Sequence, residues 1–179
     1  MRTFALLPAA LGLFAGCRAA VPPADAELAL QACRHAKELS DREEYDAALV
    51  EIRRAIELDP RNAWAHYHQG WMLSETGGCE RALPSYGRAI ELLAQDAPSD
   101  SLRWKALLNR GWCELQLGRH APAIADLSQV IEHTRERRWL RMAFDFRAQS
   151  EFALGLQEQG RRDQDEAARL GAEADGREP

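Results

Sequence analysis

The chain has 179 residues, of which 46% are hydrophobic and 28% charged, so it is a globular protein with room for one modest core. Its formal net charge is -5 at pH 7, and its Lys and Arg residues are interspersed with acids rather than gathered on one stripe. This pattern argues against a phosphate-binding surface, and we therefore expect no nucleic-acid partner.

The first 16 residues have the features of a signal peptide. Arg2 gives a positive start, and residues 4–16 form an apolar run that is too short to span a bilayer. Residues 13–17 (Leu-Phe-Ala-Gly-Cys) resemble the lipobox of bacterial lipoproteins, with Phe14 where Leu is usual. The resemblance implies removal of residues 1–16, lipidation of Cys17 and a membrane anchor. An ordinary cleavage site near Cys17, which would release a secreted or periplasmic soluble product, is the alternative.

The residues after the expected cleavage site indicate a location and a tether. Arg18 follows the lipidated position, and by resemblance to proteobacterial lipoproteins the absence of Asp there favours the outer membrane. The protein would then face the periplasm. Residues 17–25 are interpreted as the lipidated Cys and a short stiff tether, because Pro22-Pro23 favours extended backbone and Asp25 can cap the following helix.

A pattern of small and apolar residues then returns at fixed spacing. Residues 36, 48, 55 and 56 are matched 34 residues later at 70, 82, 89 and 90, and again 41 residues on at 111, 123, 130 and 131. A period of this length is one helical hairpin, which cannot bury its apolar face alone and must stack on its copies. The spacing predicts repeats at 29–62, 63–96 and 104–137. The segment Ala97 to Arg103 is then a longer surface connection.

Within the first repeat the pattern predicts helices over 29–39 and 43–58, the second ended by Asp59-Pro60. A fourth segment, 141–171, fits less well, because Gly160 stands where Ala is expected and Gln164 where an aromatic residue is expected. We interpret it as a partial repeat or a polar capping helix. Residues 172–179 are expected to be a disordered tail, which leaves one folded domain over 26–171.

These residues look like the tetratricopeptide repeat (TPR), over roughly residues 26 to 170. The resemblance rests on the small and aromatic positions of three consecutive units in one phase, among them Ala36, Tyr45, Ala48, Ala55, Pro60, Gly70, Leu73, Gly77, Ala82, Tyr86 and Ala89. It implies an all-α, right-handed solenoid of about three and a half helical hairpins. Such arrays bind proteins and usually perform no chemistry, so we expect no enzyme.

The resemblance also implies where a partner binds. In TPR arrays, ligands commonly contact the concave surface made by the second, fifth, ninth and twelfth positions of each first helix. Carried over to this chain, those positions include Lys37, Trp64, Tyr67, Trp71, Lys105, Leu108 and Trp112. Exposed rings of this kind mark recognition surfaces. The alternative is that one or more of them pack between neighbouring helices. The paired Lys and Asn that the family uses to clamp chain-end carboxylates are not matched.

No group of residues predicts catalysis, a metal site, a cofactor or a small-molecule substrate. His66 and His68 are two residues apart and so point to different sides of a helix. After Cys17, three cysteines remain. Cys79 and Cys113 are expected at adjacent ends of two packed helices, where a disulfide is possible, and small buried thiols are the alternative reading.

The sequence therefore favours an adaptor or assembly factor of the bacterial cell envelope, which grips a segment of another envelope protein in its concave groove. A structural, self-associating envelope lipoprotein that forms a homo-oligomer is the second hypothesis. The partner's identity does not follow from the sequence.

Overall fold

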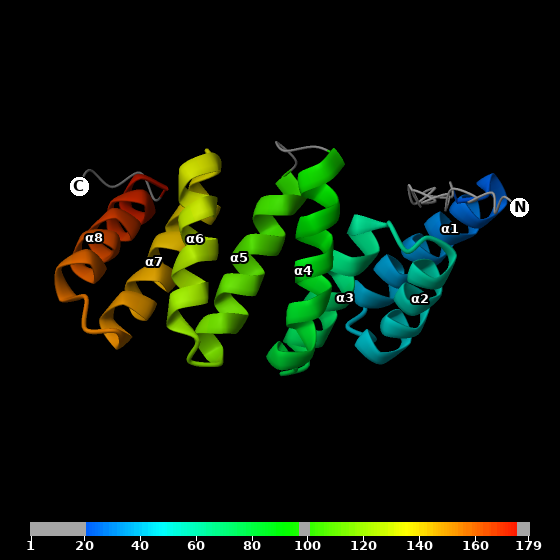
Figure 1. The fold of residues 1–179 in the computed structure, drawn as a ribbon, viewed down its shortest axis with the longest axis horizontal. Coiled ribbons are helices and arrows are strands. Elements are labelled where there is room, and N and C mark those ends of the chain that lie inside the picture. The colour runs from blue at the N-terminus through cyan, green and yellow to red at the C-terminus, as the bar shows by residue number, and fades with distance from the viewer. Residues whose placement is uncertain (1–20, 97–100, 175–179) are drawn as a thin grey trace, which may run out of the picture.

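The computed structural model describes residues 21–96 and 101–174, and every regular element within them is an α-helix. The helices are α1 (Pro23–Ser40), α2 (Tyr45–Leu58), α3 (Ala63–Glu75), α4 (Cys79–Asp96), α5 (Ser101–Gln116), α6 (His120–His133), α7 (Arg137–Ala153) and α8 (Gln157–Ala174). Consecutive helices form hairpins that lie side by side along the long axis of the molecule (Figure 1). The predicted all-α solenoid is confirmed.

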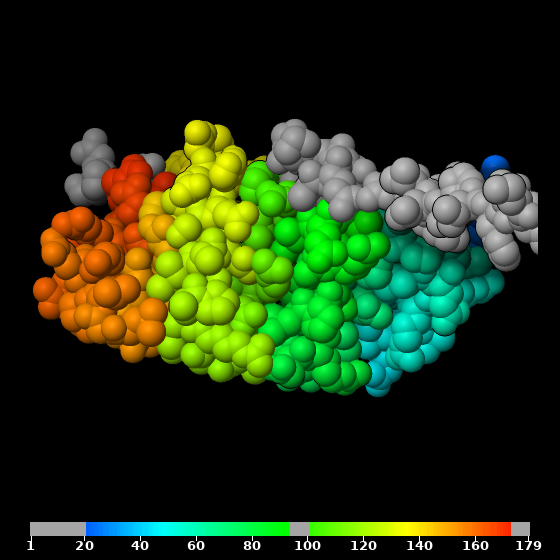
Figure 2. All heavy atoms as spheres, in the orientation of Figure 1, coloured from blue at the N-terminus to red at the C-terminus, as the bar shows by residue number. Residues whose placement is uncertain are grey.

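The odd-numbered helices form the inner layer of the stack. Each helix packs chiefly against its neighbours in sequence, but α3 also contacts α5, and α5 contacts α7. On this side, alternate helices therefore meet directly from α3 to α7. Side chains close the spaces between the ribbons on the side shown in Figure 2.

Small residues let the two helices of a hairpin approach closely. A Cβ atom added to Gly70 would lie 2.8 Å from the Tyr86 ring, and one added to Gly111 would lie 2.9 Å from Leu127. The Tyr86 hydroxyl is buried and hydrogen-bonded to Ser74 Oγ at 3.0 Å. Burial raises the pKa of this phenol above its ordinary range, so it stays protonated. The repeating small positions are therefore a requirement of packing.

The turn inside each hairpin needs a left-handed residue. Gly77, Gly118 and Gly155 have φ values of 76°, 71° and 77°, which glycine adopts without steric cost. The equivalent position in the first hairpin is Glu43, with a φ of 63°. A side chain in this region is strained by about 1–2 kcal/mol relative to glycine.

Two helices begin earlier in the chain than expected. The first helix begins at Pro23, with Pro22 as its N-cap, so the end of the predicted tether is helical and Asp25 lies in the first turn instead of capping it. Proline suits this position because it has no N–H that would go unbonded. Helix α5 begins at Ser101, so residues 101–103 of the predicted connection are helical as well.

The fourth hairpin has a close contact of its own. Helices α7 and α8 lie against each other, and a Cβ added to Gly160 of α8 would lie 2.7 Å from the Phe152 ring of α7. Gln164 is exposed, whereas its equivalents Tyr86 and Leu127 are buried, so this position does not require an aromatic residue. The outer residues of α8 are polar and exposed.

A polar pair joins the two helices of every hairpin at residues 16 apart. The pairs are His35–Glu51 (3.5 Å), Gln69–Ser85 (2.8 Å), Arg110–Asp126 (2.7 Å) and Arg147–Asp163 (2.6 Å). Their first members recur at intervals of 34, 41 and 37 residues. The fourth hairpin therefore has the same arrangement as the other three, at a different spacing along the chain.

Several expectations concern residues outside the described ranges. The apolar run of residues 4–16, the lipidation site Cys17 and residues 97–100 of the connection belong to this group. Within the described part, none of the helices combines the length and the apolar character that crossing a membrane requires.

Candidate protein-binding groove

Three hollows follow one another along the face formed by the odd-numbered helices. The first lies between α1 and α3, the second between α3 and α5, and the third is bounded by α3, α5 and α7. We call this face the groove. It runs across all four hairpins, because each contributes its first helix.

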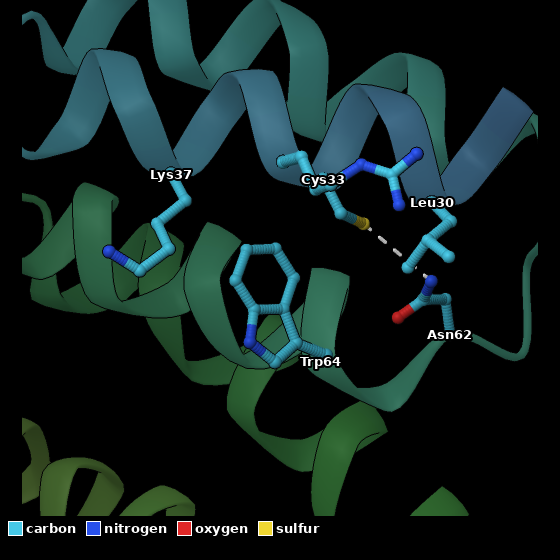
Figure 3. Close-up of a pocket in the computed structure, with 6 residues that line it drawn as sticks. Leu30, Cys33, Lys37, Asn62 and Trp64 are labelled. Carbon is cyan, nitrogen blue, oxygen red and sulfur yellow. Dashed lines mark hydrogen bonds between the residues drawn. The ribbon is translucent and has the colours of Figure 1, made fainter.

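The first hollow has a volume of about 190 Å³ and is lined by Leu30, Cys33, Arg34, Lys37, Asn62 and Trp64. Figure 3 shows the Trp64 indole below α1, with Lys37 toward one end of the hollow and Leu30 toward the other. Asn62 caps α3 by accepting a hydrogen bond from the Ala65 N–H at 3.0 Å, and its amide nitrogen donates to Cys33 Sγ at 3.6 Å. The walls are apolar and the rim is cationic.

The second hollow is built around His68. The ring of His68 lies 3.8 Å from that of Trp64 and 4.9 Å from that of Tyr67, measured between centroids. Burial, and to a smaller extent the charges of Lys105 and Lys37, lower the pKa of His68 to about 4. At neutral pH the imidazole is therefore uncharged, and the positive charge in this hollow comes from the two lysines.

Lys37 and Lys105 reach this region from opposite sides. Lys105 lines the second hollow, and its Nζ lies 5.0 Å from the centroid of the Trp139 ring. Lys37 Nζ is 2.7 Å from Asp41 on its own helix, with both side chains more than 60% exposed. An exposed pair of this kind contributes little stability, so Lys37 is available to other anions.

The third hollow, of about 180 Å³, extends the groove into the fourth hairpin. It is lined by Trp71, Ser74, Glu75, Asn109, Trp112, Met142 and Phe146. The two residues from α7 were missed at the sequence level, because the weak match of the fourth repeat gave no register in which to place them. Asn109 was missed too, and its amide donates to the Tyr67 hydroxyl at 3.3 Å.

The seven residues predicted for the groove occupy two different environments. Trp64, Trp71 and Trp112 are partly exposed and line the hollows, as does Lys105. Lys37 is exposed.

Tyr67 and Leu108, by contrast, are only 9% and 3% exposed and belong to the core. Cys33, at the equivalent position of the first hairpin, is buried as well. This position therefore faces a neighbouring hairpin, and Leu108 contributes packing rather than open surface. Tyr67 still presents an edge to the second hollow.

The cysteines of the described residues are buried thiols. Burial raises the pKa of Cys33 to about 11, and burial together with the neighbouring Cys79 thiol raises that of Cys113 further. Cys79 and Cys113 thus lie next to each other in reduced form, and a disulfide between them stays a prediction. Across residues 21–96 and 101–174, no group of three His, Cys, Asp or Glu side chains is placed to hold a metal ion.

Solved structures of similar fold place this arrangement among TPR proteins. The MamA protein is 19% identical, with a TM-score of 0.70 over 85% of this chain and 78% of MamA. The first TPR domain of Spaghetti (RPAP3), bound to the HSP90 peptide SRMEEVD, is 18% identical, with a TM-score of 0.64 over 73% of this chain and 95% of that domain. The fold is a TPR-like solenoid.

A further structural neighbour is BtubC from P. vanneervenii, at 15% identity and a TM-score of 0.73, covering 85% of this chain and 66% of BtubC. No family model and no curated protein matches the sequence. The likeness therefore concerns the fold alone.

Proposed function

We propose that this protein is an adaptor or assembly factor of the bacterial cell envelope, which holds a segment of another envelope protein in the groove. The observation that carries the proposal is the line of partly exposed rings at Trp64, Trp71 and Trp112, each beside a hollow on the same face. Rigid aromatic side chains offer a large contact area at a low cost in conformational entropy.

The spacing of the hollows suits an elongated ligand. Neighbouring helices pack about 8–10 Å apart, so equivalent positions on α1, α3, α5 and α7 form a continuous strip along which side chains of a partner can insert. The peptide complex of the Spaghetti domain shows that a TPR solenoid of similar fold accepts a short segment. The groove of this chain is proposed to do the same with a segment of a protein partner.

The location is a second part of the proposal. Residues 4–16 and Cys17 support a lipid anchor, with the folded domain in the periplasm and the outer membrane as the favoured site. Cys17→Ser should move the protein from the membrane to the soluble fraction and abolish labelling by a fatty-acid analogue. Labelling that persists in this variant would refute the anchor without touching the groove.

The binding proposal is tested by crosslinking in the host. A photoreactive amino acid in place of Trp112 in the full chain should yield a discrete adduct with one envelope protein, identified by mass spectrometry. The same group in place of Val50, which is 58% exposed on α2 and away from the hollows, is the control. We expect no such adduct from it.

Affinity for the identified partner then decides the role of the rings. Trp112→Ala should weaken binding by about 2 kcal/mol, roughly thirtyfold, while leaving the melting temperature nearly unchanged. If this substitution unfolds the domain, the ring is a core residue. Adducts that consist only of a second copy of this chain, together with a dimeric mass by light scattering, would favour the self-associating lipoprotein instead.

A further inference from the structure

We propose that the groove selects a partner segment in which a bulky apolar side chain lies beside an internal carboxylate. The apolar group enters the first hollow, and the carboxylate enters the second hollow, on the other side of Trp64. This inference rests on the binding function proposed above and names the chemistry of the partner.

The first hollow fits an apolar side chain. Its volume of about 190 Å³ is close to that of one large residue, and its walls are Leu30, Cys33 and the Trp64 ring. Leu30 is 47% exposed at the rim, so it can close over a side chain that enters. The Cys33 thiol faces Asn62, and burial keeps it protonated at neutral pH, so it adds no charge.

The second hollow fits a carboxylate. Lys105 lines it, Lys37 lines the adjoining first hollow on the other side of Trp64, and among the residues that the structure describes no Asp or Glu lines the second hollow. Lys37 and Lys105 are also the only lysines in the whole sequence, although the chain has 23 Lys and Arg residues. Compact ammonium groups at a partly desolvated site attract a carboxylate and fix the orientation of the segment that bears it.

The third hollow sets the direction of the segment. Glu75 lines it, so this end of the groove repels a second acid. The carboxylate of the partner must therefore lie at the second hollow, between α3 and α5, with the uncharged or basic part of the segment directed toward α7.

The carboxylate belongs to a side chain rather than to a chain end. The groove continues past the second hollow to the third, so a segment that lies along it crosses the second hollow in mid-chain. The carboxylate that Lys105 meets there is then carried by a side chain.

The test uses four dodecapeptides, acetylated and amidated so that no chain end is charged. They share Gly-Ser flanks and differ in a central Phe-Glu-Leu-Glu, Phe-Gln-Leu-Gln, Ser-Glu-Ser-Glu or Phe-Lys-Leu-Lys. Each is titrated by calorimetry into the full chain held in lipid nanodiscs. We expect the first peptide to bind at least about tenfold more tightly than each of the others.

Zero-length carbodiimide coupling gives an independent readout, because it joins only a carboxylate and an amine in direct contact. Peptide mass spectrometry should find the Phe-Glu-Leu-Glu peptide on Lys37 or Lys105. In the double variant Lys37→Gln/Lys105→Gln, the preference for Glu over Gln should vanish, while the Phe-Gln-Leu-Gln peptide binds as before. Arg88→Gln removes an exposed cation on α4, outside the residues that line the hollows, and should change nothing.

The outcomes separate this inference from the proposed function. Equal affinity for the Glu and Gln peptides, or a Glu preference that survives the double lysine variant, overturns the carboxylate assignment and leaves apolar binding in the groove intact. Equal affinity for the Phe-Glu-Leu-Glu and Ser-Glu-Ser-Glu peptides overturns the assignment of the first hollow. If no peptide binds, the inference and the binding groove fail together.

Discussion

The first and fourth hairpins are both ends of the solenoid, with one neighbouring hairpin each, yet they are held together differently. In hairpin four, Arg147 donates two hydrogen bonds to Asp163, at 2.6 and 2.9 Å, and a third to Ser128 of α6. In hairpin one, the equivalent pair is His35–Glu51 at 3.5 Å, with His35 56% exposed.

The turns and the small residues also differ in a way that favours the stability of hairpin four. Hairpin four turns at Gly155 and buries Gly160 against Phe152, whereas hairpin one turns at the strained Glu43 and places Ala48 where Gly160 lies. The comparison teaches that one hairpin plan tolerates very different local stabilities. The weaker end bears the first hollow of the groove.

The polar pairs should give the largest difference in stability between the two hairpins. Asp163→Ala should lower the free energy of unfolding by about 3 kcal/mol, because it leaves a largely buried guanidinium without its main partner. Glu51→Ala, at the equivalent position, should cost less than about 0.5 kcal/mol, because its partner is exposed. Urea unfolding of both variants measures the difference, and similar losses would contradict the comparison.

The second prediction concerns the close contact of Gly160. Gly160→Ala should lower stability by about 1–2 kcal/mol, since the added methyl meets the Phe152 ring and overpacking outweighs the gain in helix propensity. Adding Phe152→Leu should recover most of this loss, whereas Phe152→Leu alone leaves a cavity. A Gly160→Ala variant as stable as the natural chain would show that the ring can move aside.

The third prediction is a gain in stability for hairpin one and a loss for hairpin four. Glu43→Gly should raise the free energy of unfolding by about 0.5–1 kcal/mol. The substitution removes the steric strain of a side chain at positive φ, and the larger backbone entropy of glycine in the unfolded chain offsets part of this gain. Gly155→Ala in hairpin four should lower stability by about 1 kcal/mol for the converse reason. Thermal unfolding monitored by circular dichroism reports both changes, and destabilisation by Glu43→Gly would refute the strain.

The smallest effect concerns local opening. Iodoacetamide should modify Cys33 in hairpin one before Cys113, although both thiols are buried. Opening of the weaker hairpin exposes its thiol first. Glu43→Gly should slow the modification of Cys33 by about threefold and leave that of Cys113 unchanged. Faster modification of Cys113 in the natural chain would place the weak point elsewhere.

How far the sequence predicted the molecule depends on the residue. The turns at Gly77 and Gly118 and the close contacts of Gly70 and Gly111 follow from single residue types, because glycine adopts a left-handed turn without steric cost and leaves room for a closely packed helix. The fourth hairpin was harder to predict. Gly160 and Gln164 differ from the residue types expected at their positions, so a residue-by-residue match to the earlier repeats is weak there.

The groove residues divide in the same way into those that the sequence predicted and those that it did not. The positions of Trp64, Trp71 and Trp112 on one face follow from the helical period. The burial of Leu108 depended on the neighbouring hairpins, and the contribution of Met142 and Phe146 depended on the register of α7. The polar pairs of residues 16 apart were missed because His, Gln and Arg occupy equivalent positions, and their common role appears only when the partner on the second helix is seen.

The sequence by itself determined the repeat, the hairpin and the side on which the aromatic rings lie, because these follow from spacing along one or two helices. Only the tertiary structure decided which groove positions remain open, and that Lys37 lines the first hollow and Lys105 the second, on the two sides of Trp64. The physical reason is distance along the chain. Helical periodicity is set by residues three or four apart, whereas burial and electrostatic environment are set by side chains brought together from different hairpins.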